Sequence, residues 1–128
     1  MSSSYADGGV LSTVEDLCRY GTAMIDSFQG RPGAVLSEDT MRRLWTVEAS
    51  TGEYRGKGTE YYGLGWFLAD TETFAFMPNH GGIVFGLHSI LLVYPQERTA
   101  VAIIAQADIP GRFELSSDLV NIFLDSNY

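Results

Sequence analysis

The sequence has few of the residues that build metal sites and disulfides. Its 128 residues include one cysteine, Cys18, and two histidines, His80 and His88. A single cysteine cannot close an intrachain disulfide, and two histidines lack the further ligands that a zinc site needs. We therefore expect no bound metal and no cofactor.

Positive charge is scarce as well. Eight basic residues stand against sixteen acidic ones, which gives a net charge of −8 at pH 7. A chain with this balance repels phosphate backbones and anionic membranes, so no nucleic-acid partner is expected. The simplest meaning of the charge is a solvated acidic surface that favours solubility.

Long apolar runs and a signal peptide are missing from the sequence. No stretch approaches the roughly eighteen apolar residues of a membrane-spanning helix. The start, Met1-Ser2-Ser3-Ser4, has neither the basic flank nor the apolar core of a secretory signal. We expect a soluble protein without a membrane span, in the cytoplasm or in mitochondria, with any targeting segment lying upstream of this sequence.

The composition that remains is typical of a folded globular protein, with 45% hydrophobic and 19% charged residues. Ser12 and Glu15 form a capping box in front of apolar residues at helical spacing, which predicts a helix. Ser37 can cap a second helix, and an amphipathic pattern near the end of the chain indicates a third. The predicted helices cover residues 13–28, 37–46 and 114–125.

The second half of the sequence is rich in β-forming residues. Gly63 and Gly65 lie inside an aromatic run, which indicates a strand whose glycines let another backbone come close. The linker Pro95–Arg98 has hairpin length and indicates antiparallel pairing of the runs beside it. The polar, Gly-rich residues 49–60 predict a mobile surface loop. The predicted strands cover residues 61–69, 74–84, 88–94 and 99–106.

The order of these elements predicts the fold class. Two helices, three or four strands in a meander and a last helix that can lie across the sheet make an α+β arrangement. A chain of 128 residues can bury one core, so residues 1–128 form a single domain or part of one.

Several short segments follow one another in a specific order and spacing. They are Ala6–Thr13 (ADGGVLST), Leu36–Met41 (LSEDTM), Tyr62–Trp66 (YGLGW), His80–Gly82 (HGG) and Leu91–Pro95 (LLVYP). Together they resemble the β-lactamase-related serine hydrolases, the superfamily of class C β-lactamases, D-alanyl-D-alanine carboxypeptidases and serine esterases. Among these, the mitochondrial serine β-lactamase-like proteins are the most similar. The resemblance covers the chain from Tyr5 onward.

This resemblance implies the C-terminal half of the β-lactamase and penicillin-binding-protein transpeptidase-like fold. The family's chemistry uses a Ser-x-x-Lys, a Tyr-x-Asn or Ser-x-Asn, and a Lys/His-Thr-Gly motif. The only lysine, Lys57, follows Tyr54 by three residues, and no asparagine stands two residues after a tyrosine or serine. The chain therefore contains no nucleophile, and we expect it to correspond to the part of the domain after both missing motifs.

The third motif has a candidate here. The resemblance places His80 at the Lys/His position, Gly81 at the Thr position and Gly82 at the Gly position, with the amide of Ile83 in an oxyanion hole. An extended substrate would pair with this strand, and His80 would donate a hydrogen bond or assist proton transfer. Gly81 lacks the hydroxyl that binds a substrate carboxylate, which favours an ester or a neutral amide or peptide.

Each of these residues also has a plainer interpretation. His80 and the glycines after it could form a turn, and His88 is better explained as a half-buried histidine bound to a neighbour. Cys18, on the apolar face of the first helix, is expected to be a buried structural thiol. Four aromatic residues could line a substrate cleft or belong to the core: Tyr61, Tyr62, Trp66 and Phe67.

Two functions remain open on this basis. In the first, the parent protein is a serine hydrolase acting through an acyl-enzyme on a small ester or peptide, and this chain is inactive without the N-terminal half of the same domain. In the second, the chain is a non-catalytic binding or self-assembly module, a pseudoenzyme that forms a homo-oligomer through an exposed strand edge.

Overall fold

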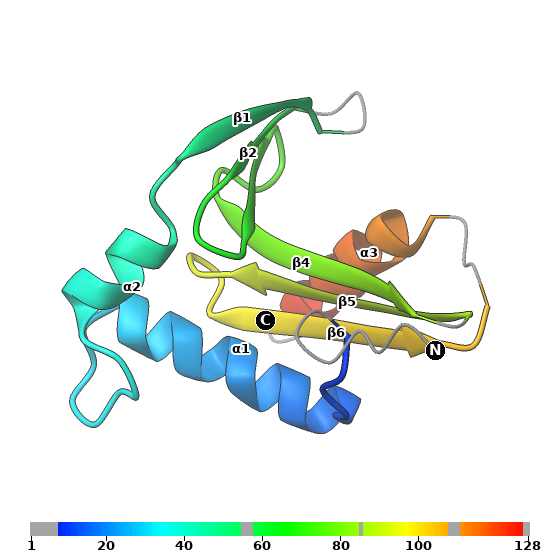
Figure 1. Cartoon of the computed structure of the whole chain (residues 1–128), viewed down its shortest axis with the longest axis horizontal. Helices are drawn as coiled ribbons and strands as arrows, with labels where there is room; N and C mark the ends of the chain where they lie inside the picture. Colours follow the sequence, from blue (N-terminus) through cyan, green and yellow to red (C-terminus); the bar gives the residue numbers. More distant parts are fainter. Residues whose placement is uncertain (1–7, 55–57, 85, 108–110, 127–128) are drawn as a thin grey trace.

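The computed structural model describes residues 8–54, 58–84, 86–107 and 111–126 (Figure 1). The elements in chain order are α1 (Val14–Phe28), α2 (Glu38–Leu44), β1 (Ala49–Glu53), β2 (Gly58–Tyr62), β3 (Phe67–Thr71), β4 (Met77–Val84), β5 (Leu87–Tyr94), β6 (Thr99–Ala105) and α3 (Arg112–Asp125). The strands form one antiparallel sheet in sequence order, from β1 to β6. The predicted α+β class and antiparallel meander are confirmed. The expected number of three or four strands is wrong, because this sheet has six.

Two of the six strands lie where the sequence predicted a mobile loop over 49–60. β1 and β2 occupy most of that stretch and pair with each other, with a bulge between Ser50 and Gly52. Gly58 has φ 154°, and a Cβ at this position would collide with the Asp70 carbonyl of β3. Glycine here permits close pairing of two strands. The prediction of a loop over 49–60 is therefore wrong for the described residues, because Gly58 is required by packing in the sheet.

The strand expected over 61–69 is also wrong in its extent, because β2 ends at Tyr62 and β3 begins only at Phe67. The turn between them starts at Gly63. A Cβ on Gly63 would stand 2.7 Å from the Leu44 carbonyl oxygen, so this glycine admits a neighbouring backbone as predicted. The close approach sets the end of α2 against the β2–β3 hairpin.

The helix caps locate α1 and α2 along the chain. Thr13 is the N-cap of α1, and its Oγ1 accepts a hydrogen bond from the Asp16 amide at 3.2 Å. The predicted capping box starting at Ser12 is thus wrong by one residue, because the helix begins where a side chain reaches an unpaired amide. Ser37 caps α2 as predicted, accepting from the Thr40 amide at 3.2 Å.

β5 is buried on both faces and divides the core into two clusters. Leu91 and Val93 pack with α1 and α2 on one face of the sheet. Ile90, Leu92 and Tyr94 pack with α3 on the other. The helices accordingly cover opposite faces (Figure 1), and the continuous apolar run of β5 is what burial on both faces requires.

Within the described ranges, no helix has the length and apolar character needed to cross a lipid bilayer.

Candidate functional site

The residues predicted to form a site lie on a part of β4 that has a neighbouring strand on one edge only. β3 pairs with β4 from Met77 to Asn79, whereas β5 pairs with it from Asn79 to Val84. Across the described residues, no strand lies beside the second edge of β4 from His80 to Val84. An open backbone edge is the feature that an extended ligand can pair with.

The amide of Ile83 points to this open edge. A Cβ built on Gly81 would lie 3.1 Å from the Ser89 carbonyl oxygen, so Ser89 directs its carbonyl toward β4. Ser89 faces Gly82 in the register, which makes theirs the hydrogen-bonded type of pair. Backbone groups alternate in direction along a strand, so Gly81 and Ile83 direct their N–H groups away from β5. The open edge thus presents two amides, two residues apart.

His80 is exposed just beyond the end of β3, against two aromatic side chains of the β2–β3 hairpin. Tyr62 Oη lies 3.3 Å from His80 Nε2, within hydrogen-bond distance. The Phe67 ring centroid is 5.4 Å from that of the imidazole and 4.8 Å from that of Tyr62. The imidazole is therefore accessible to a ligand while a phenol from another strand contacts it.

The sequence predicts Tyr62 and Phe67 as aromatics of a cleft or of the core, without a link to His80. Tyr62 is 18 residues away from His80 along the chain. Only the pairing of β2 with β3 and of β3 with β4 brings these side chains together. The contact has no local sequence signal, because it depends on the register of the β2–β3 and β3–β4 strand pairs.

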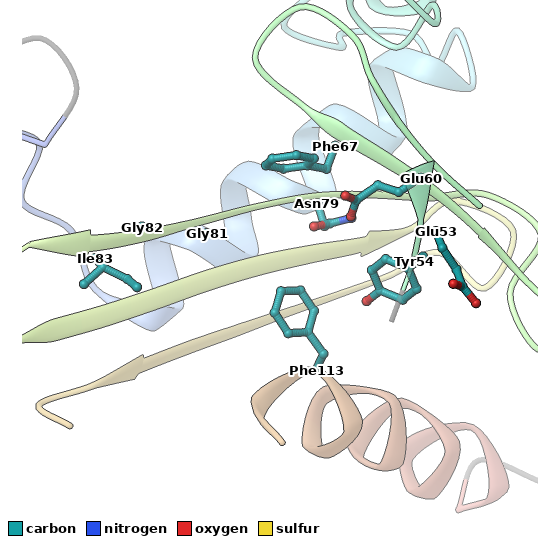
Figure 2. A pocket seen from close by; sticks show the side chains of 9 residues that line it. All are labelled: Glu53, Tyr54, Glu60, Phe67, Asn79, Gly81, Gly82, Ile83 and Phe113. Atoms are coloured by element: carbon teal, nitrogen blue, oxygen red, sulfur yellow. The ribbon is translucent and has the colours of Figure 1, made fainter. Parts of the chain in front are cut away.

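Cavities open on both sides of the β4 edge. On the α3 side, a cavity of about 410 Å³ is lined by Glu53, Tyr54, Glu60, Phe67, Asn79, Gly81, Gly82, Ile83 and Phe113. Figure 2 shows Asn79 near the centre, with Phe67 and Glu60 on one side and Tyr54 and Phe113 on the other. On the α1 side, a cavity of about 310 Å³ includes His80, Gly81 and Gly82 among its lining residues. The two glycines line both cavities, so this stretch of strand is open from either face.

The described lining of the larger cavity is acidic. It includes Glu53 and Glu60 and, among the residues that the structure describes, no lysine or arginine. Arg55 and Lys57, which follow Tyr54 in the sequence, lie outside the described residues. Glu60 Oε1 accepts a hydrogen bond from Thr51 Oγ1 at 3.1 Å. Asn79 is 2% exposed, and its Nδ2 donates to the Met77 carbonyl at 3.2 Å. A ligand with a free carboxylate would meet repulsion from both glutamates here.

The smaller cavity has an aromatic wall. Tyr20 of α1 stacks on Trp66 with ring centroids 6.1 Å apart, and both residues line the cavity. Burial raises the pKa of Tyr20 above its ordinary value of 10.0. Trp66 is 6% exposed and belongs mainly to the core, and Tyr61 packs against the same core cluster.

The other sequence candidates lie away from the open edge. His88 is partly buried on β5, opposite Ile83. Cys18 is half-buried on α1, with Sγ 3.8 Å from the Ala100 carbonyl oxygen. Lys57 lies outside the described residues. Of the side chains that the structure describes, no three His, Cys, Asp or Glu gather into a metal-binding group.

Comparison with known proteins gives the chain its family. The family model described as Beta-lactamase matches residues 1–122. The chain is 31% identical over 119 residues to the Bos taurus protein "Serine beta-lactamase-like protein LACTB, mitochondrial", covering 80% of the chain and 21% of that protein. The Mus musculus protein of the same name is 31% identical over 138 residues, covering 94% and 24%.

The chain thus spans about a quarter or less of the length of these relatives. No solved structure matches it. The match to the family model over most of the sequence agrees with the motifs on α2, β4 and β5. The chain belongs to the beta-lactamase family, a family of serine hydrolases.

Proposed function

We propose that this chain supplies the substrate-binding edge and the oxyanion amide of a serine hydrolase active site, and that it has no turnover alone. The observation that carries the proposal is the open edge of β4 from His80 to Val84, with the Ile83 amide directed outward beside a cavity. A substrate lying along this edge would pair with it as an added strand.

The proposed chemistry follows from where charge develops in acyl transfer. When a serine hydroxyl attacks the scissile carbonyl, negative charge forms on the carbonyl oxygen, and an amide aimed at that oxygen stabilises it by a few kcal/mol. Ile83 N–H takes this role. His80, held by Tyr62, donates to the substrate or assists the proton transfer that accompanies attack.

The proposed substrate is an ester or a neutral amide or peptide. Gly81 offers no hydroxyl to a carboxylate, and Glu53 and Glu60 add negative charge to the described lining of the cavity. These features disfavour penicillin-like substrates, which carry a carboxylate. A neutral or cationic group is compatible with the same surroundings.

The nucleophile in this proposal comes from polypeptide outside these 128 residues. The chain contains no Ser-x-x-Lys, and the relatives whose printed name includes "serine" are four to five times longer than the aligned stretch. The same printed name supports a mitochondrial location as part of the proposal.

Substrate turnover tests the first part of the proposal. The chain is incubated with nitrocefin and with p-nitrophenyl acetate, and hydrolysis is followed by absorbance. We expect rates equal to those of a buffer blank, because no serine in the chain has a lysine three residues on. Hydrolysis that a serine-reactive phosphonate blocks would contradict the proposal.

Ligand binding tests the open edge. A short blocked peptide is titrated into isotopically labelled chain, and amide NMR shifts are recorded. We expect shifts concentrated at residues 80–84, and their loss in Ile83→Pro, which removes the outward amide and spares the ladder with β5. Ile83→Val keeps the amide and serves as the control. Equal binding by both variants would exclude a role for this amide.

The substrate class can be tested at Gly81. Gly81→Thr restores a hydroxyl, and we expect benzylpenicillin to bind about three- to tenfold tighter, as one hydrogen bond to a charged group permits. Gly81→Val has nearly the same shape without the hydroxyl and is the matched control. A gain in both variants would show that the added volume, and not the hydroxyl, improves binding.

A second candidate function is a binding or self-assembly module without catalysis. The observation that favours it is the apolar outer edge of β6. The two functions differ in what the whole protein does, because only the first requires a Ser-x-x-Lys elsewhere in the polypeptide and turnover by the complete domain.

A further inference from the structure

A further cavity of about 580 Å³, which we call the α3 cavity, lies between the end of β3 and one flank of α3. Its lining includes Thr71, Phe74 and Asn121. The cavity of about 410 Å³ beside Gly81–Ile83, which we call the edge cavity, faces the proposed substrate-binding stretch of β4. Of the residues that the structure describes, Tyr54 is the one that lines both cavities. Its side chain therefore stands where the two cavities meet.

The backbone of Tyr54 is fixed at the end of an exposed strand. Tyr54 directly follows β1, and its amide donates a hydrogen bond to the Gly58 carbonyl at 2.8 Å. All five residues of β1 are exposed, whereas Tyr54 is only 6% exposed. Tyr54 is thus the point at which this exposed stretch of chain is anchored in the interior.

The ring of Tyr54 is held on the α3 side of the sheet. It belongs to the core cluster that contains Phe74, Met77 and Tyr94. Its centroid is 6.1 Å from that of the Phe113 ring at the start of α3, with an interplanar angle of 80° (Figure 2). Edge-to-face contact of this kind is favourable for two aromatic rings. Because a closely packed core resists displacement, the ring limits the space available to a ligand on its side of the edge cavity.

A substrate on the open edge of β4 would direct part of its structure toward this ring. Side chains alternate between the two faces of a sheet, so an added strand turns every second side chain to the α3 face. Such a side chain would enter the edge cavity beside Gly81–Ile83. Tyr54 forms one wall of the space open to it. A longer substituent would need the α3 cavity as well, and the Tyr54 ring stands between the two.

We propose that Tyr54 is a specificity-determining residue of the active site, which restricts the substrate to a compact group on the α3 face. The inference rests on the proposed function, because it assumes a substrate that pairs with the open edge of β4. Without the Tyr54 ring, the edge cavity and the α3 cavity would form one continuous space, more than twice as large as the edge cavity alone. A substrate with a long substituent would then be accepted.

The α3 cavity also indicates which substituent tests its accessibility. Its described lining combines the apolar Phe74 and Met77 with the acidic Glu72 and Asp118. The apolar residues offer contact area to an aromatic ring, and the acidic ones disfavour a carboxylate at the far end of the substituent. An uncharged aromatic extension is therefore the appropriate probe.

Binding of matched peptides tests the inference. Blocked peptides of sequence Ala-x-Ala, in which x is alanine, phenylalanine or 4-phenylphenylalanine, are titrated into isotopically labelled chain and followed by amide NMR shifts. We expect the wild type to bind the phenylalanine peptide more tightly than the 4-phenylphenylalanine peptide. Tyr54→Ala should bind the longer peptide at least about tenfold more tightly than the wild type does, as burial of one more aromatic ring permits. The longer peptide should then shift the amides of Ser117 and Asn121, which line the α3 cavity.

Further variants separate the position of the ring from its effect on stability. Tyr54→Phe retains the ring and should retain the preference of the wild type for the shorter peptide. Phe74→Leu is the matched control, because it removes a buried aromatic ring of the same core cluster, lines only the α3 cavity and leaves Tyr54 in place. Tyr54→Leu keeps an apolar side chain in the core and takes the place of Tyr54→Ala if that variant fails to fold.

The outcomes distinguish failure of this inference from failure of the proposed function. If none of the peptides shifts residues 80–84 of the wild type, the proposed binding edge is wrong, and the inference falls with it. If the peptides bind at residues 80–84 but the longer one gains no affinity in Tyr54→Ala or Tyr54→Leu, the binding edge stands and the role of Tyr54 is overturned. An equal gain in Phe74→Leu would also overturn that role, because the wall is intact in this variant.

Discussion

At the residue scale, the contact between Tyr62 and His80 decides how the imidazole is presented. The Tyr62 hydroxyl can donate a hydrogen bond to Nε2, and this contact favours the neutral tautomer that carries its hydrogen on Nδ1. Phe67 packs against the same ring and limits its rotation. In the proposed function, Tyr62 is thus a positioning residue that acts through His80.

Tyr62→Phe tests this positioning. We expect the ring ¹⁵N shifts of His80 to move toward a mixture of tautomers when measured well above the usual histidine pKa. The signals of His88, the other histidine, should stay in place. Tyr61→Phe, which alters a neighbouring residue packed on the core, is the control. Unchanged His80 shifts in Tyr62→Phe would mean that the phenol does not set the tautomer.

A second effect at this scale concerns Tyr94, which is 0% exposed. Burial raises the pKa of Tyr94 above its ordinary value of 10.0, while nearby hydroxyls of Ser117 and Ser116 act in the opposite direction. The folded state holds the phenolic proton more tightly than the unfolded chain does. Its contribution to stability is therefore complete below pH 10 and is lost as the pH rises through the folded-state pKa.

The free energy of unfolding should fall as the pH is raised above about 10, and Tyr94→Phe should flatten that fall. Urea denaturation at several alkaline pH values measures this pH dependence of the free energy of unfolding. Tyr20→Phe provides a comparison, because Tyr20 also has a raised pKa but is 47% exposed, and its effect should be much smaller. The same alkaline slope in Tyr94→Phe and the wild type would contradict this account.

At the scale of elements, the packing of α1 on β6 depends on a residue without a side chain. A Cβ on Gly21 would stand 2.7 Å from the Ala100 Cβ, closer than two carbon atoms can pack. Helical glycine normally costs about 0.5–1 kcal/mol relative to alanine. Here the close approach of helix and strand outweighs that cost.

Gly21→Ala should accordingly lower the free energy of unfolding by about 1–2 kcal/mol, because overpacking outweighs the helical gain. Urea denaturation measures the change. The double variant Gly21→Ala with Ala100→Gly should recover at least half of it, since the second change makes room. A single variant more stable than the wild type would show that helix and strand can separate freely.

The elements with strong periodicity could be predicted from sequence, and those that depend on tertiary contacts could not. α1, α2, β5 and β6 have clear apolar patterns, and their ranges lie within two residues of the expected ones. β1 and β2 lie in a polar, Gly-rich stretch, so their strand character comes from pairing, of β1 with β2 and of β2 with β3. Gly58 illustrates the ambiguity, because glycine occurs both where two strands pair closely and where a loop is flexible, and the sequence alone does not distinguish the two.

The candidate site likewise has a part that sequence predicts and a part that depends on tertiary contacts. The family motif identified His80, Gly81, Gly82 and Ile83 as one group, and the structure places them on the open part of β4. Their catalytic roles stay predictions. Tyr62 could not be assigned to the group from sequence, because two strand registers stand between it and His80.

At the scale of the whole molecule, β5 joins the two halves of the core. Its odd-numbered side chains from Leu91 to Val93 complete the core beneath α1, and its even-numbered ones complete the core beneath α3. If either core cluster unfolds, it exposes one face of β5, and the other cluster then loses the strand against which it packs. The two cores should therefore melt in a single cooperative transition, and amide exchange should report one common opening energy along β5 from both sides of the sheet.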